Sequence, residues 1–110
     1  MLYLQQMSKG IQNLEGPAVV YVISYDLQAP NDGPEDYERV IETIKTNFTW
    51  CHLQKSVWLV RSDLSASEIR DKIISSLRDG DELFVGRLEG NWASWGLGDR
   101  RNTWLHKSSF

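Results

Sequence analysis

Residues 18–26, with the sequence AVVYVISYD, are apolar almost throughout and rich in β-branched and aromatic side chains. A run of this kind is typical of a central β-strand that is covered on at least one face. The run ends at Asp26, and the turn-forming residues of the segment LQAPNDGP follow it. The rest of the chain must therefore supply elements that bury this strand.

Two amphipathic helices are predicted to do so. The first begins at Pro34, a residue suited to the first helical position, and carries apolar side chains at helical spacing as far as Phe48. The second begins at Ser65, which has the spacing of a capping box with Glu68. Gly80 is well placed to end this second helix, because it readily adopts a left-handed conformation.

Three further segments have the composition of β-strands. Residues 49–61, TWCHLQKSVWLVR, have a polar centre that fits either a tight hairpin or one kinked strand. Residues 82–88 predict another strand, and residues 92–97 predict a short last strand. The order of these elements favours an α+β, ferredoxin-like βαββαβ sandwich. In that plan two helices lie on one face of an antiparallel sheet, here with a short extra C-terminal strand.

The length of 110 residues is enough for one domain. We expect a loose N-terminal arm at 1–16, the ferredoxin-like domain at 17–97 and a C-terminal tail at 98–110. The single cysteine, Cys51, excludes an intrachain disulfide and a cysteine-based structural zinc site. No membrane-spanning run and no signal peptide are recognised, which predicts a cytoplasmic protein without a membrane partner. The net charge of −3 does not favour a nucleic-acid-binding protein, because such proteins usually carry a surplus of basic residues.

Three segments occur in an order that carries a family resemblance: VYVISYD at 20–26, HLQKSVWLV at 52–60 and DELFVGRL at 81–88. Together they resemble the small CRISPR-associated subunit of spacer adaptation, CRISPR-associated protein two. The virulence-associated protein D toxins look similar in the same places. Residues 81–96, DELFVGRLEGNWASWG, look closest to uncharacterised relatives that are sometimes labelled SinR-like.

The resemblance implies a symmetric homodimer and, for many members, metal-dependent cleavage of RNA or DNA. The family's functional aspartate matches Asp26, which predicts Asp26 as catalytic residue and as ligand of Mg²⁺ or Mn²⁺. Magnesium is typically held by one or two carboxylates, and a two-fold axis beside the strand end would bring Asp26 next to its mate. A divalent cation would relieve the repulsion between the two carboxylates. The leading hypothesis is thus a homodimeric, metal-dependent endoribonuclease.

Charge and sequence position suggest further site residues, although Trp58 also fits a core or sheet-face position. The arginines proposed to contact RNA or DNA are Arg39, Arg61 and Arg87. The residues proposed for the dimer interface are Ser56, Trp58, Trp92 and Trp95. The family's partners are an integrase-like subunit in the CRISPR system and an antitoxin in the toxin systems.

The segment after Asp26 favours a competing function. Where many relatives carry arginines, this chain has Asp32, Glu35, Asp36 and Glu38, with Arg39 as the one basic residue. Negative charge there repels a phosphate backbone, whose neutralisation supplies most nucleic-acid affinity. The competing hypothesis is a non-catalytic dimeric binding or scaffold module, similar to the CRISPR adaptation subunit or to a toxin–antitoxin protein.

Overall fold

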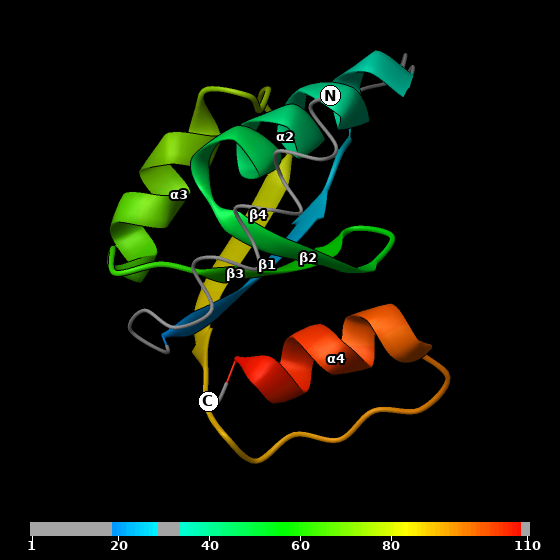
Figure 1. Ribbon diagram of the computed structural model, residues 1–110. Coiled ribbons are helices and arrows are strands. Elements are labelled where there is room, and N and C mark those ends of the chain that lie inside the picture. The colour runs from blue at the N-terminus through cyan, green and yellow to red at the C-terminus, as the bar shows by residue number, and fades with distance from the viewer. Residues whose placement is uncertain (1–18, 29–33, 109–110) are drawn as a thin grey trace.

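The computed structural model of the protein describes residues 19–28 and 34–108, so the expected arm at 1–16 lies outside the described residues. Within these ranges the chain forms three helices and a four-stranded antiparallel sheet (Figure 1), which is an α+β fold. The elements are β1 (Val20–Asp26), α2 (Pro34–Asn47), β2 (Thr49–Gln54), β3 (Val57–Arg61), α3 (Ala66–Ile74), β4 (Glu82–Leu88) and α4 (Asp99–Lys107).

The apolar run at the start of the described chain does form a central strand. The strands lie in the order β2-β3-β1-β4, and every neighbouring pair is antiparallel. Ile23 at the middle of β1 lies opposite Trp58 of β3 and opposite Val85 of β4. This arrangement is compatible with the ferredoxin-like plan.

Residues 49–61 form a hairpin, which decides between the two alternatives that the sequence leaves open. Strands β2 and β3 pair antiparallel, and the polar residues Lys55 and Ser56 make the turn between them. The register shifts between His52 and Gln54, which marks an irregularity of the β-bulge type in β2.

Helices α2 and α3 cover one face of the sheet, as predicted (Figure 1). Val40 and Ile44 of α2 and Ile69 and Ile73 of α3 are fully buried against the sheet. The sheet contributes a buried set of Tyr21, Ile23, Tyr25, Trp58 and Val60. The Trp58 indole N–H donates a hydrogen bond to the Tyr25 hydroxyl at 3.1 Å, so the largest buried side chain also has its polar atom satisfied.

The predicted start of α3 is confirmed, but its predicted end is wrong. Ser65 is the N-cap, and its reciprocal hydrogen bonds with Glu68 complete the capping box. The helix ends at Ile74, several residues before Gly80. Gly80 does have a positive φ of 91°, yet it lies in the turn that enters β4, where the Asp81 carboxylate accepts a hydrogen bond from the Arg78 N–H.

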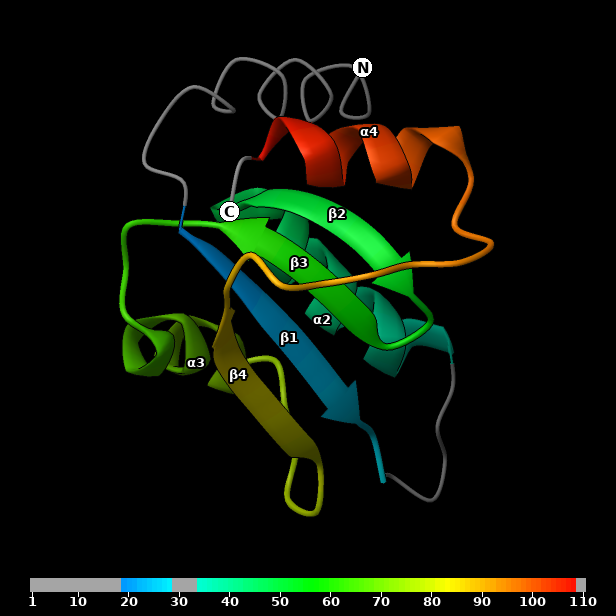
Figure 2. The ribbon, with the colours of Figure 1, turned by 90° about the horizontal axis from the view of Figure 1, so that it is seen from below.

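The expected C-terminal strand at 92–97 is absent, and residues 89–98 contain no strand. Gly96 and Gly98 have φ values of 79° and 84°, which turn the chain out of an extended conformation. The chain then forms α4, an element for which the sequence pattern gives no period. Figures 1 and 2 show that α4 lies on the sheet face opposite to α2 and α3.

Helix α4 closes a second hydrophobic core on that face. Leu105 is buried there together with Val20, Cys51 and Leu59 from three strands. Partly buried side chains surround this group, namely Val22, Leu53, Leu88, Trp92, Leu97 and Trp104. The sheet is therefore packed on both faces near α4, and its surface is exposed only where the helix does not reach.

Candidate functional site

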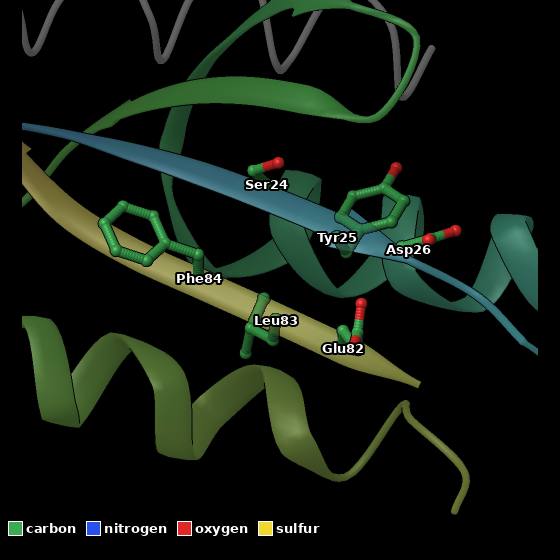
Figure 3. A pocket seen from close by; sticks show the side chains of 6 residues that line it. All are labelled: Ser24, Tyr25, Asp26, Glu82, Leu83 and Phe84. Atoms are coloured by element: carbon green, nitrogen blue, oxygen red, sulfur yellow. The ribbon is translucent and has the colours of Figure 1, made fainter. Parts of the chain in front are cut away.

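Asp26 lies at the exposed end of β1, directly opposite Glu82 at the start of β4. Directly opposite residues of an antiparallel pair have Cα atoms about 4.5–5.5 Å apart and project to the same face of the sheet. Figure 3 shows both side chains at this end of the strand pair. A second carboxylate of the same chain thus accompanies Asp26, without any need for a partner subunit.

These two residues line an open hollow of about 200 Å³. Its lining consists of Ser24, Tyr25, Asp26, Glu82, Leu83 and Phe84 (Figure 3). Phe84 is opposite Ser24 and 62% exposed, which is unusual for a large apolar side chain in a strand. The hollow therefore offers two carboxylates, the Ser24 hydroxyl and the Phe84 ring, whereas the Tyr25 hydroxyl is buried and accepts the Trp58 N–H. Among the described residues that line the hollow, none is Lys, Arg or His.

Hydrogen bonds hold the chain in place around this hollow. The Gln28 side-chain amide donates to Asp26 Oδ2 at 3.0 Å, and the Gln28 backbone N–H donates to Asp81 Oδ1 at 2.8 Å. The backbone N–H groups of Arg78 and of Gln28, in that order, lower the pKa of Asp81. Asp81 thus ties the exit of β1 to the entrance of β4, which keeps Asp26 beside Glu82.

A divalent cation fits the donor set only in part. Asp26 and Glu82 supply the one or two carboxylates that are typical of a magnesium site. In the described part of the chain, no three side chains of the types His, Cys, Asp or Glu gather as a metal-binding group. A cation held by both carboxylates would be neutralised by them, and the lining residues within 19–28 and 34–108 add no positive charge for a substrate phosphate.

The three arginines proposed to contact nucleic acid lie on three different elements. Arg61, on β3, is only 6% exposed, and burial lowers its pKa. Arg87, on β4, is exposed, with its Nε 3.4 Å from a carboxylate oxygen of Glu89. Arg39, on α2, is exposed and makes a small contribution to the lowered pKa of Asp81. The structure does not bring the three together beside Asp26.

The four residues proposed for the dimer interface also lie in different environments. Trp58 has 0% exposure within one protomer, so its place is the core and it has no surface to offer a partner. Ser56 lies in the β2–β3 turn, where its carbonyl accepts the Tyr25 N–H at 3.2 Å. Trp92 is half-buried, and its ring lies 5.5 Å from that of His106 on α4. Trp95, at 96% exposure, is the one of the four with a fully available side chain.

Two other reactive residues have structural roles. The His52 ring stacks on Trp58, with ring centroids 3.9 Å apart and planes 4° apart. Cys51 is buried beneath α4, and burial raises its pKa to about 11. A thiol with so high a pKa is not activated as a nucleophile.

Sequence reasoning did not single out Glu82 or Phe84. Their position beside Asp26 depends on the pairing of β1 with β4, which are separated by more than fifty residues and by two helices. The sequence offers one signal for them: an acidic residue, Glu82, begins a predicted strand, and an aromatic residue, Phe84, follows two positions later. That signal becomes a site only when the strand order is known.

No family model matches this sequence, and comparison with curated proteins gives no match. Among residues 19–28 and 34–108, no helix is both long enough and apolar enough to cross a membrane.

Proposed function

We propose that the chain is a cytoplasmic, homodimeric binding or scaffold module that acts without catalysis. In this proposal its fold is the ferredoxin-like βαββαβ type, and it is related to the CRISPR-associated protein two and virulence-associated protein D superfamily, with the SinR-like group among its relatives. The observation that carries the proposal is the chemistry of the hollow beside Asp26, where the described lining residues include two carboxylates and no cationic side chain.

That chemistry does not favour a phosphodiester substrate. Each phosphate carries a negative charge, and affinity for nucleic acid comes mainly from Lys and Arg side chains that neutralise it. Asp26 and Glu82 would repel a phosphate at this position. Of the three proposed arginines, Arg61 is buried, and Arg87 lies opposite Tyr21, away from the Asp26 end of the strand pair. Arg39 helps to lower the pKa of Asp81 but is not among the described residues that line the hollow.

A metal-dependent endoribonuclease is the second candidate, and the direct pairing of Asp26 with Glu82 favours it. These two carboxylates would hold Mg²⁺ or Mn²⁺, and the ion would supply polarisation of the phosphate and activation of water. Gln28 would orient Asp26 through its 3.0 Å hydrogen bond. The family's other arrangement, in which Asp26 pairs with Asp26 of a second subunit, needs a two-fold axis at the end of β1.

An RNA-cleavage assay with Mg²⁺ or Mn²⁺ separates the two candidates. We expect the wild-type chain and Asp26→Ala to show the same background rate, because Asp26 performs no chemistry in our proposal. Glu42→Ala, which removes an exposed carboxylate on α2, is the matched control. A cleavage rate that falls a hundredfold in Asp26→Ala and is unchanged in Glu42→Ala would establish the nuclease instead.

Sedimentation tests the homodimer. We expect the wild-type chain to sediment with twice the chain mass. Trp95 is the exposed interface residue predicted from the sequence, and Trp95→Ala tests that surface without unfolding the protomer, because the side chain is almost wholly exposed. A dimer that forms through Trp95 is weakened by this change, and a dimer that forms through another surface is not. A wild-type chain that is monomeric at all accessible concentrations would refute the homodimer.

A further inference from the structure

Strand β4 is an edge of the sheet, with β1 as its hydrogen-bonded neighbour on one side. The Tyr25 N–H donates to the Ser56 carbonyl and the Val19 carbonyl accepts the Ser62 N–H, so odd-numbered residues of β1 direct their backbone groups toward β3. Even-numbered residues of β1 therefore face β4 and pair with even-numbered residues of β4. It follows that Leu83, Val85 and Arg87 direct their N–H and C=O groups outward, at the free edge.

The two edges of the sheet differ in how they are protected. Edge strand β2 is irregular between His52 and Gln54, and Arg101 of α4 donates a hydrogen bond to the Leu53 carbonyl at 2.8 Å. Bulges and charged side chains are the usual devices that stop an edge from pairing with another chain. Strand β4 pairs with β1 without a register shift over seven residues and contains no proline. Of the two edges, β4 is the one suited to pairing.

An exposed apolar side chain lies on the same strand. The large apolar side chains that are exposed among the described residues are Ile74, Phe84 and Trp95. Phe84 belongs to β4 and lies on the sheet face of Val22 and Leu88, whereas Ile74 belongs to α3, which covers the other face. The Phe84 ring lies over Gly86, where a Cβ atom added to the glycine would be 2.9 Å from the ring. Phe84 thus lies along the strand and adds an apolar surface to its free backbone edge.

We propose that β4 of a second copy of this chain pairs with β4, antiparallel and across a two-fold axis, with Phe84 opposite the partner's Phe84. This inference rests on the proposed homodimer and specifies its surface. Because Phe84 faces β1 with its backbone, the two Phe84 residues form a non-hydrogen-bonded pair across the axis, with Cα atoms about 4.5 Å apart. Aromatic pairs at such positions stabilise antiparallel sheets.

The same register also places opposite charges across the interface. Arg87 falls opposite the partner's Asp81, and the symmetry repeats this contact on the other side of the axis. Glu82 falls opposite the partner's Gly86, where no side chain opposes it. Asp79 and Glu89 lie beyond the ends of β4 and have no strand partner in this register, so the charge complementarity rests on Arg87 and Asp81. This contact, made twice by the symmetry, favours a second copy as the occupant of the edge.

Disulfide trapping tests the register. Starting from Cys51→Ser, which removes the single cysteine, we would introduce Phe84→Cys or, as the matched control on the same face and strand, Glu82→Cys. Disulfides need Cα atoms about 4.4–6.8 Å apart, a distance that the position-84 pair meets in this register. The two positions 82 would be four residues out of register, roughly 13 Å along the strand. A disulfide dimer at 84 and not at 82 supports the proposal, and equal yields at both, or none at either, overturn it.

Sedimentation of Phe84→Lys gives a second readout. Two like charges directly opposite each other destabilise a strand pair, so we expect the dissociation constant to rise at least tenfold. Thr103→Lys, an exposed substitution on α4, is the control for added charge and should leave the dimer unchanged. An unchanged far-UV circular dichroism spectrum and melting temperature verify that Phe84→Lys is folded. A dimer that survives Phe84→Lys would overturn the β4 interface alone, whereas a monomeric wild type would overturn the homodimer itself.

Discussion

Leu105 is the residue on which the docking of α4 depends most, and Leu105→Ala is the sharpest test of this packing. The side chain is 4% exposed and packs in one cluster with Val20, Leu59 and Cys51 from three strands. Truncating a buried leucine to alanine costs about 2–5 kcal/mol, depending on how well the surroundings fill the space. Trp104, half-buried beside it, can shift toward the space. We therefore expect a loss of about 2–3 kcal/mol in the free energy of unfolding.

Urea denaturation measures this loss. Tryptophan fluorescence is a suitable signal, because Trp92 and Trp104 both pack in the cluster that Leu105 completes. A loss of this size should also lower the melting temperature by roughly 10 °C or more, since each kcal/mol is worth about 4–8 °C in a domain of this size. The control is Thr103→Ala, which removes an exposed side chain from the same helix.

The control should change the free energy of unfolding by no more than about 0.5 kcal/mol, as is usual for surface substitutions. If Leu105→Ala were equally mild, α4 would not be packed on the sheet. The two-core description of the fold would then be refuted.

Three further predictions concern the same framework. Cys51 should react with a thiol reagent at least tenfold faster in Leu105→Ala than in the wild type. The reason is that loosening α4 exposes the thiol and lowers its pKa from about 11. Equal reaction rates would contradict a thiol that is covered by α4. Asp81→Asn should destabilise the protein most at neutral pH. Backbone N–H groups lower the folded-state pKa of Asp81, so the extra stability of the wild type is complete above the ordinary pKa of 3.8 and is lost as the pH falls through the lower folded-state pKa. Unfolding curves of both proteins at pH 7 and pH 3 measure this difference in stability. A difference that does not change with pH would refute the prediction. Ser65→Ala should cost about 1 kcal/mol by thermal melting, because it removes the N-cap of α3, while Ser67→Ala, on the exposed side of that helix, should not.

Much of the fold could be predicted from local patterns. The continuous apolar run gave the central strand, since only a strand paired on both edges and covered by helices buries such residues. The pair Ser65 and Glu68 gave the start of α3, because a capping box depends on spacing alone. The end of that helix does not lie at Gly80, because the chain leaves α3 after Ile74, where the Ser76 and Leu77 N–H groups bond to the Ile73 and Ile74 carbonyls in a tight turn.

The C-terminal segment could not be predicted, and the reason is physical. Helix α4 buries one residue fully, Leu105, so its sequence shows almost no apolar period. The aromatic residues at 92–97 resemble a strand in composition, but Trp92 and Leu97 instead pack on the sheet face beneath α4. Tertiary packing determines this segment, and local propensity does not.

Of the residues at the candidate site, only Asp26 could be predicted from the sequence. Asp26 was identified from its place at the end of a strand, whereas its neighbours Glu82 and Phe84 required the β1–β4 register. The arginines were chosen by charge, and burial removed Arg61 from the surface. A single sequence records which residues are charged, but only the strand order shows which of them face the same space.

The distance between the two Asp26 residues of the dimer tests our account most directly. In the dimer that we propose, two β4 strands separate the β1 strands, and Asp26 of each chain lies level with Val22 of the other. Three strand spacings and four residues along the strand place the two Asp26 Cα atoms about 20 Å apart. Spin labels at Asp26→Cys in the Cys51→Ser background, measured by electron paramagnetic resonance, should report a separation of this order. Labels in near contact would contradict the account and restore the paired-aspartate metal site.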